Sequence, residues 1–433
     1  MIGKTPNDKQ GNLFLPLLKD MLDPRRPLYK LANKIRWEEF ENKFKKLYRE
    51  DFGAPSKPIR LMVSLLILKQ IENLSDEDLV EKWAENPYYQ YFSGETHFSW
   101  KLPCDPTDIT YFRKRIKKSG VEKIMQVSIQ IHGNDGTEKV VCVDTTVQEK
   151  NITYPTDLKL HKKIAEQCIK ISSREGIDLR QSYKRTIPKL IKDQRFKRNV
   201  KTLKKARKSA KKLKTIANRL VRELERKLPL SKLKKYEDKI EMYKKVLEQR
   251  KCDKNKIYSL HELNVYCIAK GKEHKKYEFG SKCGIAMNWK SGIIVGATSF
   301  SENIYDGKTM PEMLEQIERL SGVAPEIAIG DRSFKGEKYV GKTEVISPKV
   351  LGKKATISEK RKMKRYFRRR AAIEPCIGHL KNDYRLRRNY LKGTLGDDIN
   401  VIMACAAYNF KKWINKAVRL FVSILFFNLK TKI

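Results

Sequence analysis

Hydrophobic residues in the first 120 positions recur with the 3.6-residue period of helices. One such stripe consists of Trp37, Phe40, Phe44 and Leu47. Pro58 favours a helix start before an apolar run that contains Leu61, Leu65, Leu66 and Leu68. Ser75 and Asp105 mark two further starts, because an aspartate follows each of them after three residues, as in a capping box. The pattern predicts a helical N-terminal domain over residues 1–130.

Strand-like patterns begin at Lys139. Val140 to Val143 form a β-branched apolar run that ends at Asp144, as expected of a buried strand. Segments 280–287 and 292–299, with four residues between them, indicate a hairpin. The later elements are a helix at 311–320, strands at 326–329 and 344–347, and a long basic helix that contains Glu374. This order predicts a mixed α/β domain over residues 131–415 with the element order of the ribonuclease-H-like fold.

A basic insertion of about 125 residues, 151–275, separates the first predicted strand from the hairpin. From Lys201 to Arg222 it contains ten Lys or Arg residues, no acid and a thin apolar stripe. Pro229 ends this pattern, and a second helical stretch covers 233–247. Two long helices in a basic hairpin could lie along a phosphate backbone, or they could form a solvated arm without a partner. The run of cations without acids favours the first interpretation.

The charge of the chain points to a polyanionic partner. Its 433 residues include 94 Lys or Arg and 51 Asp or Glu, for a net charge of +43. Such a surplus attracts nucleic acid, although a ribosome-associated or merely lysine-rich protein would share it. Hydrophobic residues make up 40% of the chain, which excludes a disordered tail. In the N-terminal region, the helix that begins near Asp105 could dock on DNA like a helix-turn-helix or serve packing and dimerisation.

The cysteines and the apolar segments help to predict the cellular compartment of the protein. The eight cysteines form no Cys-x-x-Cys pair, so we expect free thiols and no zinc knuckle. No secretory signal pattern opens the chain, and the apolar run Leu420–Leu429 is too short to span a bilayer. We expect a soluble, cytoplasmic and nucleoid-associated protein whose residues 416–433 form a C-terminal tail.

Three carboxylates occupy positions that this fold could bring together. Asp144 and Asp331 each follow a predicted strand, and Glu374 lies on the last helix. The first and fourth strands are neighbours in the expected sheet, and the last helix packs across them. Oxygen ligands of this kind suit Mg²⁺ or Mn²⁺, and two such ions can support phosphoryl transfer. Each acid could instead cap a turn or helix, and five other acids remain candidates: Glu149, Asp157, Glu166, Asp306 and Asp383.

Two cations flank Glu374. In a continuous helix, Arg370 and Lys381 would lie within about 40° of Glu374 around the axis. A carboxylate between two cations suits a metal site beside a phosphodiester. An ordinary salt bridge from Arg370 to Glu374 would explain part of the pattern.

Several motifs carry a resemblance to a known family. Val143-Asp144-Thr145-Thr146, Lys276-Tyr277-Glu278-Phe279-Gly280, Gly330-Asp331-Arg332 and Ile373-Glu374-Pro375 resemble bacterial insertion-sequence transposases of the DDE class, in the insertion sequence five group. Arg370, Glu374 and Lys381 match the spacing of a Tyr, Arg, Glu, Lys signature in that class, although Phe367 stands in place of its tyrosine. The similarity extends to the N-terminal region and so covers nearly the whole chain.

The resemblance implies roles for these residues. Asp144, Asp331 and Glu374 would form the catalytic triad that binds two Mg²⁺ or Mn²⁺ ions. Arg370 and Lys381 would hold DNA phosphates near the scissile bond. The departures at Lys308, Ser333 and Phe334 remove no expected metal ligand.

The sequence therefore predicts a transposase. It would bind terminal inverted repeats, hydrolyse a phosphodiester at each end of its element and join the 3′-hydroxyls to target DNA. Pairing two ends implies at least a homodimer. The alternatives are a nuclease of the same fold that cuts without joining, and a catalytically inactive DNA-binding relic.

Overall fold

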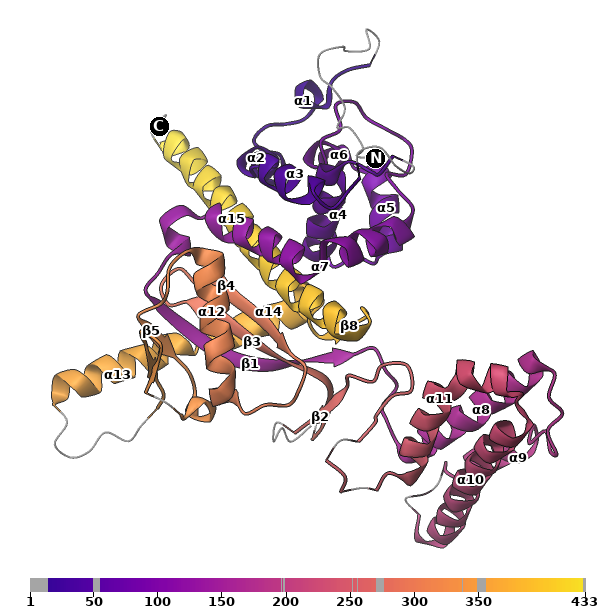
Figure 1. The fold of residues 1–433 in the computed structure, drawn as a ribbon. Helices are drawn as coiled ribbons and strands as arrows, with labels where there is room; N and C mark the ends of the chain where they lie inside the picture. The colour runs from indigo at the N-terminus through magenta and orange to yellow at the C-terminus, as the bar shows by residue number, and fades with distance from the viewer. Residues whose placement is uncertain are drawn as a thin grey trace. The chain divides into compact units, whose positions relative to one another are not determined.

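The computed structural model describes residues 15–49, 55–195, 197, 199–250, 252–254, 256–269, 276–336, 338–348 and 356–430, with side chains up to Val418 (Figure 1). The chain divides into two compact units. One comprises Met1–Lys150 and Ile268–Ile433, and the other comprises Asn151–Cys267. We refer to the first as the sheet unit and to the second as the arm.

Helices fill the N-terminal part of the sheet unit. They are α1 (Leu18–Met21), α2 (Pro27–Lys34), α3 (Glu38–Lys45), α4 (Ile59–Ile71), α5 (Asp76–Glu85), α6 (Pro87–Phe92) and α7 (Pro106–Gln130). The predicted starts of α4, α5 and α7 are confirmed. Ser75 accepts a hydrogen bond from the backbone N–H of Asp78, and Asp105 forms a full capping box with Asp108. Helix α4 is apolar around most of its circumference because it lies in the core.

A mixed sheet forms the centre of the sheet unit, which confirms the mixed α/β prediction. Its strands are β1 (Val140–Lys150), β3 (Glu278–Asn288), β4 (Ile294–Phe300), β5 (Ile327–Ile329), β6 (Tyr339–Val340), β7 (Thr343–Ile346) and β8 (Arg388–Asn389); β2 (Tyr266–Ile268) lies at the boundary of the two units. Strand β1 pairs antiparallel with β3 and parallel with β5. Strand β4 pairs with β3 to form the predicted hairpin, and β7 pairs parallel with β5.

Strand β1 is longer than the sequence predicted. It continues to Lys150, so the prediction that the strand ends at Asp144 is wrong. The β-branched residues Thr145, Thr146 and Val147 favour extended backbone, and pairing with β3 extends to Glu149. Asp144 therefore lies within a paired strand.

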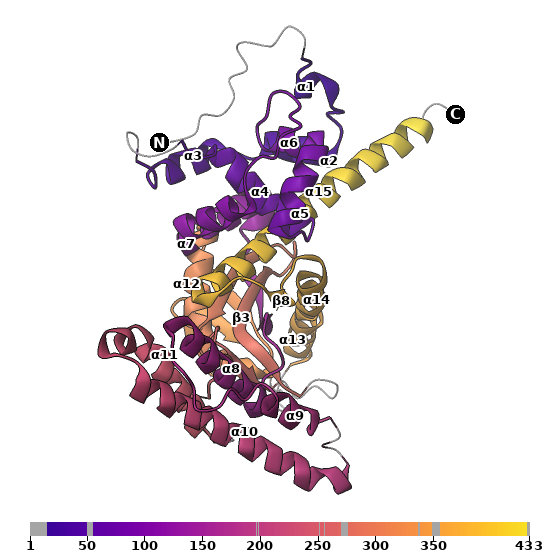
Figure 2. The ribbon, with the colours of Figure 1, turned by 90° about the vertical axis from the view of Figure 1, so that its right-hand side faces the viewer.

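Helices cover both faces of the sheet. They are α12 (Met310–Ser321), α13 (Ile357–Arg370), α14 (Ile373–Asp383) and α15 (Gly393–Lys430), with short 3-10 turns η1 (Gly133–Gly136), η2 (Asp306–Thr309) and η3 (Arg332–Phe334). Figure 2 shows the sheet between α12 on one side and α13 and α14 on the other. Helix α12 packs closely because two strand positions lack side chains. A Cβ at Gly284 would lie 2.4 Å from the sulfur of Met313, and one at Gly296 would lie 2.9 Å from Ile317.

The predicted long basic helix around Glu374 is two helices. Helix α13 ends at Arg370, α14 begins at Ile373, and 3-10-like bonds link them through Ala371 and Ala372. Pro375 explains the break, because it has no N–H to donate to the carbonyl of Ala371 and its ring would clash with that carbonyl. The prediction of one continuous helical face was therefore wrong.

Helix α15 joins the N-terminal helices to the sheet. It packs against α7, α4 and β4, and one hydrophobic core runs through all of them. A buried ion pair fixes its start, since the ammonium of Lys150 lies 2.9 Å from the carboxylate of Asp397. Within the described residues, no helix has the length and apolar character needed to cross a membrane.

The arm is helical and has its own core. It contains α8 (Asp157–Glu175), α9 (Thr186–Lys192), α10 (Val200–Lys227) and α11 (Leu230–Glu248). Helices α10 and α11 lie where the sequence predicts two long helices, and Pro229 caps the second. One stripe of α10 is buried against α8 and α11, and it includes Leu213, Ile216, Leu220 and Leu224.

Candidate active site

The pairing of β1 with β5 aligns two predicted site residues. The parallel register matches Val141 with Ala328 and Cys142 with Ile329. Asp144 and Asp331 each follow the last of these pairs by two residues. The two strands are parallel and in register. Both aspartates therefore lie at the same end of this strand pair, just beyond its last paired residues. Both side chains are partly exposed there.

Arg370 connects Asp144 to Glu374. Its Nη2 lies 3.1 Å from Oδ2 of Asp144, and its Nη1 lies 3.4 Å from Oε1 of Glu374. The side chains of Arg370 and Asp144 are only 15% and 16% exposed, whereas that of Glu374 is 64% exposed. The contact to Asp144 is therefore the better shielded of the two. Nε of Arg370 is buried and has no hydrogen-bond partner among the described residues.

Lys381 lies on the same side of α14 as Glu374. The two residues are seven positions apart within one helix, so they differ by about 20° around its axis. Lys381 is partly buried. Glu374 and Lys381 thus share one face of α14, and Arg370, which lies on α13, contacts Glu374 from across the helix break.

The turn between β3 and β4 holds the end of α13 in place. Arg369 donates hydrogen bonds to the backbone carbonyls of Trp289 and Lys290. The guanidinium of Arg365 lies 5.3 Å from the centre of the Trp289 ring, and Tyr366 packs edge-on against the same ring. These contacts fix the residues that immediately precede Arg370.

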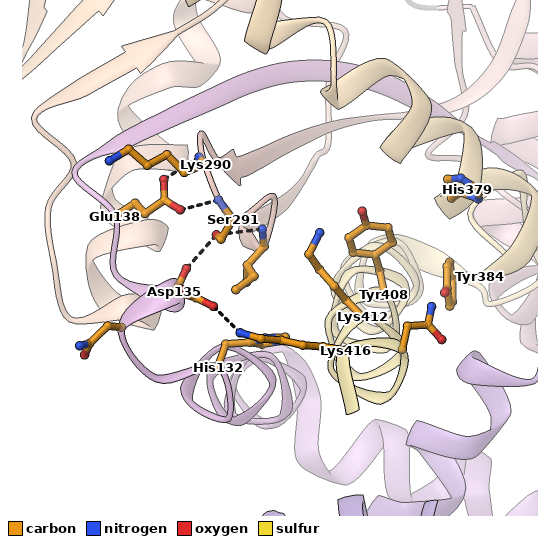
Figure 3. A pocket seen from close by; sticks show the side chains of 13 residues that line it. His132, Asp135, Glu138, Lys290, Ser291, His379, Tyr384, Tyr408, Lys412 and Lys416 are labelled. Atoms are coloured by element: carbon orange, nitrogen blue, oxygen red, sulfur yellow. Dashed lines mark hydrogen bonds and ion pairs between the residues drawn. The ribbon is translucent and has the colours of Figure 1, made fainter. Parts of the chain in front are cut away.

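The same turn is fixed from its other side (Figure 3). The carboxylate of Glu138 accepts hydrogen bonds from the backbone N–H groups of Lys290 and Ser291, at 2.7 and 2.6 Å. The Ser291 hydroxyl donates to the carbonyl of Asp135, whose carboxylate pairs with Lys416. These residues border a cavity of about 850 Å³, and the five predicted site residues are not among those that line it. The cavity is therefore separate from the candidate site.

Asp306, one of the acids that the sequence left open, contacts residues close in sequence to the two aspartates. It accepts hydrogen bonds at Oδ1 from the Thr145 hydroxyl and the Lys282 ammonium, each at 2.9 Å. Burial opposes its ionisation, but hydrogen bonds from Lys282, Ser333 and Thr145 keep the pKa of Asp306 below its ordinary value. The segment Tyr305-Asp306-Gly307 offered no local signal for these contacts, because its partners come from β1, β3 and η3.

The other four acids that the sequence left open lie elsewhere. Asp157 and Glu166 belong to the arm, where they pair with Lys256 and Lys162. Asp383 pairs with His379 near the end of α14. Glu149 lies opposite Gly280 in the β1–β3 ladder, five residues beyond Asp144.

Comparisons with known proteins identify the family. Residues 16–115 match a family model described as a transposase domain, and residues 264–410 match one described as a transposase DDE domain. The chain is also 40% identical over 185 residues to a Rhizobium meliloti protein described as "Uncharacterized protein ORF8 in nfe locus", covering 42% of this chain and 89% of that protein. This chain belongs to the family of DDE insertion-sequence transposases. No solved structure matches it.

The two family matches cover some residues of the candidate site and not others. Asp331, Arg370, Glu374 and Lys381 lie within the DDE match, whereas Asp144 and all of the arm before residue 264 lie between the two matches. The link between Asp144 and the matched segment is structural: it consists of the β1–β5 register and the ion pair with Arg370.

The donor chemistry of the site suits a divalent cation of the Mg²⁺ type. Asp144, Asp331 and Glu374 offer carboxylate oxygens, which hard cations prefer. Across the part of the chain that the structure describes, no three Asp, Glu, His or Cys side chains are grouped closely enough to hold a metal ion. Instead, the guanidinium of Arg370 supplies positive charge between Asp144 and Glu374. The residue types fit a metal site, and Arg370 contacts two of its three carboxylates.

Proposed function

We propose that this transposase binds the terminal inverted repeats of its own element, cleaves a phosphodiester at each end and joins the 3′-hydroxyls to target DNA. One observation carries the proposal. The β1–β5 register brings Asp144 and Asp331 to one edge, where Arg370 connects Asp144 to Glu374. Three carboxylates that are distant in sequence therefore belong to one region of the sheet unit.

The strand arrangement supports a ribonuclease-H-like core. Strands β4, β3 and β1 are antiparallel neighbours, and β5 and β7 continue the sheet in parallel on the other side of β1. This arrangement puts the first strand at the centre of the sheet, beside the short strand that precedes Asp331. The match to a DDE domain supports the same fold.

In this proposal, Asp144, Asp331 and Glu374 hold two divalent ions, Mg²⁺ or Mn²⁺. When bound, such ions lower the pKa of coordinated water and neutralise charge on the phosphoryl oxygens. The protein contributes position: β1 and β5 fix the two aspartates, and α14 carries the third carboxylate. Catalysis then rests on orientation and charge neutralisation, as in phosphoryl transfer generally.

Arg370 and Lys381 are proposed to hold DNA phosphates. Nε of Arg370 is a buried donor without a partner among the described residues, and a phosphate oxygen would satisfy it. A metal ion held by Asp144 and Glu374 would compete with Arg370 for these two carboxylates. A guanidinium displaced in this way would be available to a DNA phosphate.

The arm is proposed to bind the DNA backbone without reading sequence. Lys204, Lys208, Lys211 and Arg222 are exposed on α10 and lie within about 60° of one another around its axis. They extend along about 27 Å of helix. We call these four residues the basic face of α10. Phosphates neutralised by such a row release counterions, which favours binding.

Joined products would test the proposal directly. The full chain is incubated with Mg²⁺, a duplex that carries a terminal repeat and a plasmid target. We expect repeat-dependent cleavage followed by covalent joining to the plasmid. Asp144→Asn, Asp331→Asn and Glu374→Gln should each reduce cleavage at least about 1,000-fold, because each removes a negatively charged ligand. Binding of the duplex should change by less than about twofold, since phosphate contacts come from other residues.

Three outcomes would contradict the proposal. Cleavage without joined products would indicate a nuclease. Tight binding without cleavage by the unmodified chain would indicate an inactive DNA-binding protein. Loss of folding in the three variants, seen as loss of the thermal transition, would mean that the acids are structural.

A further inference from the structure

We propose that Asp306 is a positioning residue that holds the Asp144 and Asp331 carboxylates in place for metal binding. This inference rests on the proposed function, because it assumes that the two aspartates are metal ligands. It assigns a role to an acid outside the predicted triad. Asp306 would act indirectly, through Thr145, which follows Asp144, and through Ser333, which lies two residues after Asp331.

The first link runs through Thr145. The backbone N–H of Thr145 donates to Oδ1 of Asp144 at 2.8 Å, so Thr145 orients that carboxylate. The Thr145 hydroxyl donates to Oδ1 of Asp306 at 2.9 Å. Asp306 therefore anchors the residue that orients Asp144.

The second link runs through Ser333. Its backbone N–H donates to Oδ1 of Asp331 at 2.8 Å, and its hydroxyl donates to the same oxygen. Ser333 also lies close enough to the Asp306 carboxylate to lower the pKa of that group. Asp306 thus contacts the orienting neighbour of each aspartate, and the two neighbours come from β1 and η3.

Lys282 keeps Asp306 from acting as a competing ligand. Its ammonium lies 2.9 Å from Oδ1 of Asp306 and also donates to the carbonyl of Ile304 at 2.6 Å. Both side chains are largely buried, with 9% and 17% of their surfaces exposed. A fixed cation at this distance offsets the charge of Asp306, so that charge adds little repulsion between the neighbouring aspartates.

The backbone around Asp306 is also fixed. The Thr309 hydroxyl donates to the carbonyl of Asp306 at 2.6 Å. Turn η2 passes so close to η3 that a Cβ at Gly307 would lie 3.0 Å from the carbonyl oxygen of Lys335. A side chain at position 307 would push the two turns apart and with them the links to Asp331.

Direct Mn²⁺ titration of the full chain, followed by electron paramagnetic resonance, would test the role. Asp306→Ala removes both links, and we expect the Mn²⁺ concentration for half-saturation to rise about 10-fold to 100-fold, as for other residues that orient metal ligands. Asp306→Asn keeps an oxygen acceptor for the Thr145 hydroxyl and a polar side chain beside Ser333, so its effect should be smaller, about threefold. At saturating Mn²⁺, cleavage by both variants should approach that of the unmodified chain.

Two sets of variants serve as controls. Thr145→Val and Ser333→Ala each remove one link, and each should raise the half-saturating Mn²⁺ concentration less than Asp306→Ala does. Asp135→Asn removes an exposed ion pair, to Lys416, near the start of β1. It should leave the Mn²⁺ titration unchanged.

The inference would be overturned in two ways. If Asp306→Ala and Asp306→Asn lower the melting temperature but leave the Mn²⁺ titration unchanged, Asp306 is merely structural. If Asp306→Asn binds one ion fewer and stays inactive at saturating Mn²⁺, Asp306 is itself a ligand. Failure of the proposed function looks different: the unmodified chain would then bind no Mn²⁺, and this inference would fail with it.

Discussion

The candidate active site and the arm use charge in opposite ways. In the site, the acids contact fixed partners: Asp144 and Glu374 meet Arg370, and Asp306 meets Lys282. On the basic face of α10, none of the four cations forms an ion pair with any residue that the structure describes. Paired, part-buried charge fixes geometry, whereas exposed and unpaired charge is available to a polyanion. The site thus holds its charges in place with partners, whereas α10 leaves its charges open to solvent.

The two regions also have separate cores. The arm buries its own cluster, which includes Leu160, Ile164, Leu213, Leu220 and Tyr243. The sheet unit buries another around β1, β3, α4 and α15. Changes in one region should therefore leave the folding of the other largely intact, which makes the comparison testable.

The largest expected difference is in acid stability. Burial, followed by the nearby Lys214, lowers the pKa of His161 in the arm to about 4. Between about pH 6.5 and 4, the unfolded arm therefore takes up a proton that the folded arm does not. Stability is lost as the pH falls through this window, by up to about 3 kcal/mol.

Two optical signals can separate the regions in urea unfolding at pH 7 and pH 5. All five tryptophans lie outside residues 151–267, so tryptophan fluorescence follows the sheet unit and far-UV circular dichroism follows both units. The arm transition should shift more than the fluorescence transition. His161→Leu should abolish this acid sensitivity of the arm, and an unchanged sensitivity would exclude His161 as its cause.

The next largest effect concerns DNA affinity. Replacing the basic face of α10 by glutamine (Lys204, Lys208, Lys211 and Arg222) should weaken binding to non-specific duplex about 100-fold at low salt. The slope of log K against log salt should become shallower by about 3 to 4, if each cation meets one phosphate. Binding is measured by fluorescence anisotropy between 50 and 300 mM salt, and cleavage at saturating DNA should remain within about twofold.

A matched control variant loses the same number of positive charges, four, from other positions of the arm. Lys162, Lys227, Lys244 and Lys245 also lie in the arm, but each pairs with a carboxylate. Replacing these four by glutamine should change the salt slope much less. Equal effects of the two sets would mean that net charge, and not the row on α10, determines affinity.

The smallest expected effect lies in the site. Arg370→Ala removes the cation that connects Asp144 to Glu374, so Mn²⁺ should bind about threefold to tenfold more tightly. Strand joining should nevertheless slow, because a phosphate contact is lost. Arg368→Ala, which removes an exposed cation from the same helix, should alter neither property. Weaker Mn²⁺ binding by Arg370→Ala would contradict the view that Arg370 competes with the metal.

Part of this protein was predictable from short stretches of sequence. The starts of α4, α5 and α7 follow from Pro58, Ser75 and Asp105, because helix caps act within one turn. The β3–β4 hairpin and the β5 strand before Asp331 follow from local apolar runs. The sequence also singled out Asp144, Asp331 and Glu374 as candidates, although their catalytic role stays a prediction.

Only the tertiary structure determined how these parts meet. The length of β1 depends on pairing with β3, and the contact of Arg370 with Asp144 joins residues 226 positions apart. The break before Pro375 could have been inferred from that residue, but its consequence, an arginine turned toward β1, could not. The contacts of Asp306 come from β1, β3 and η3, none of which is adjacent to it in sequence. Caps and periodicity act over a few residues, whereas register and long-range ion pairs exist only once the sheet has formed.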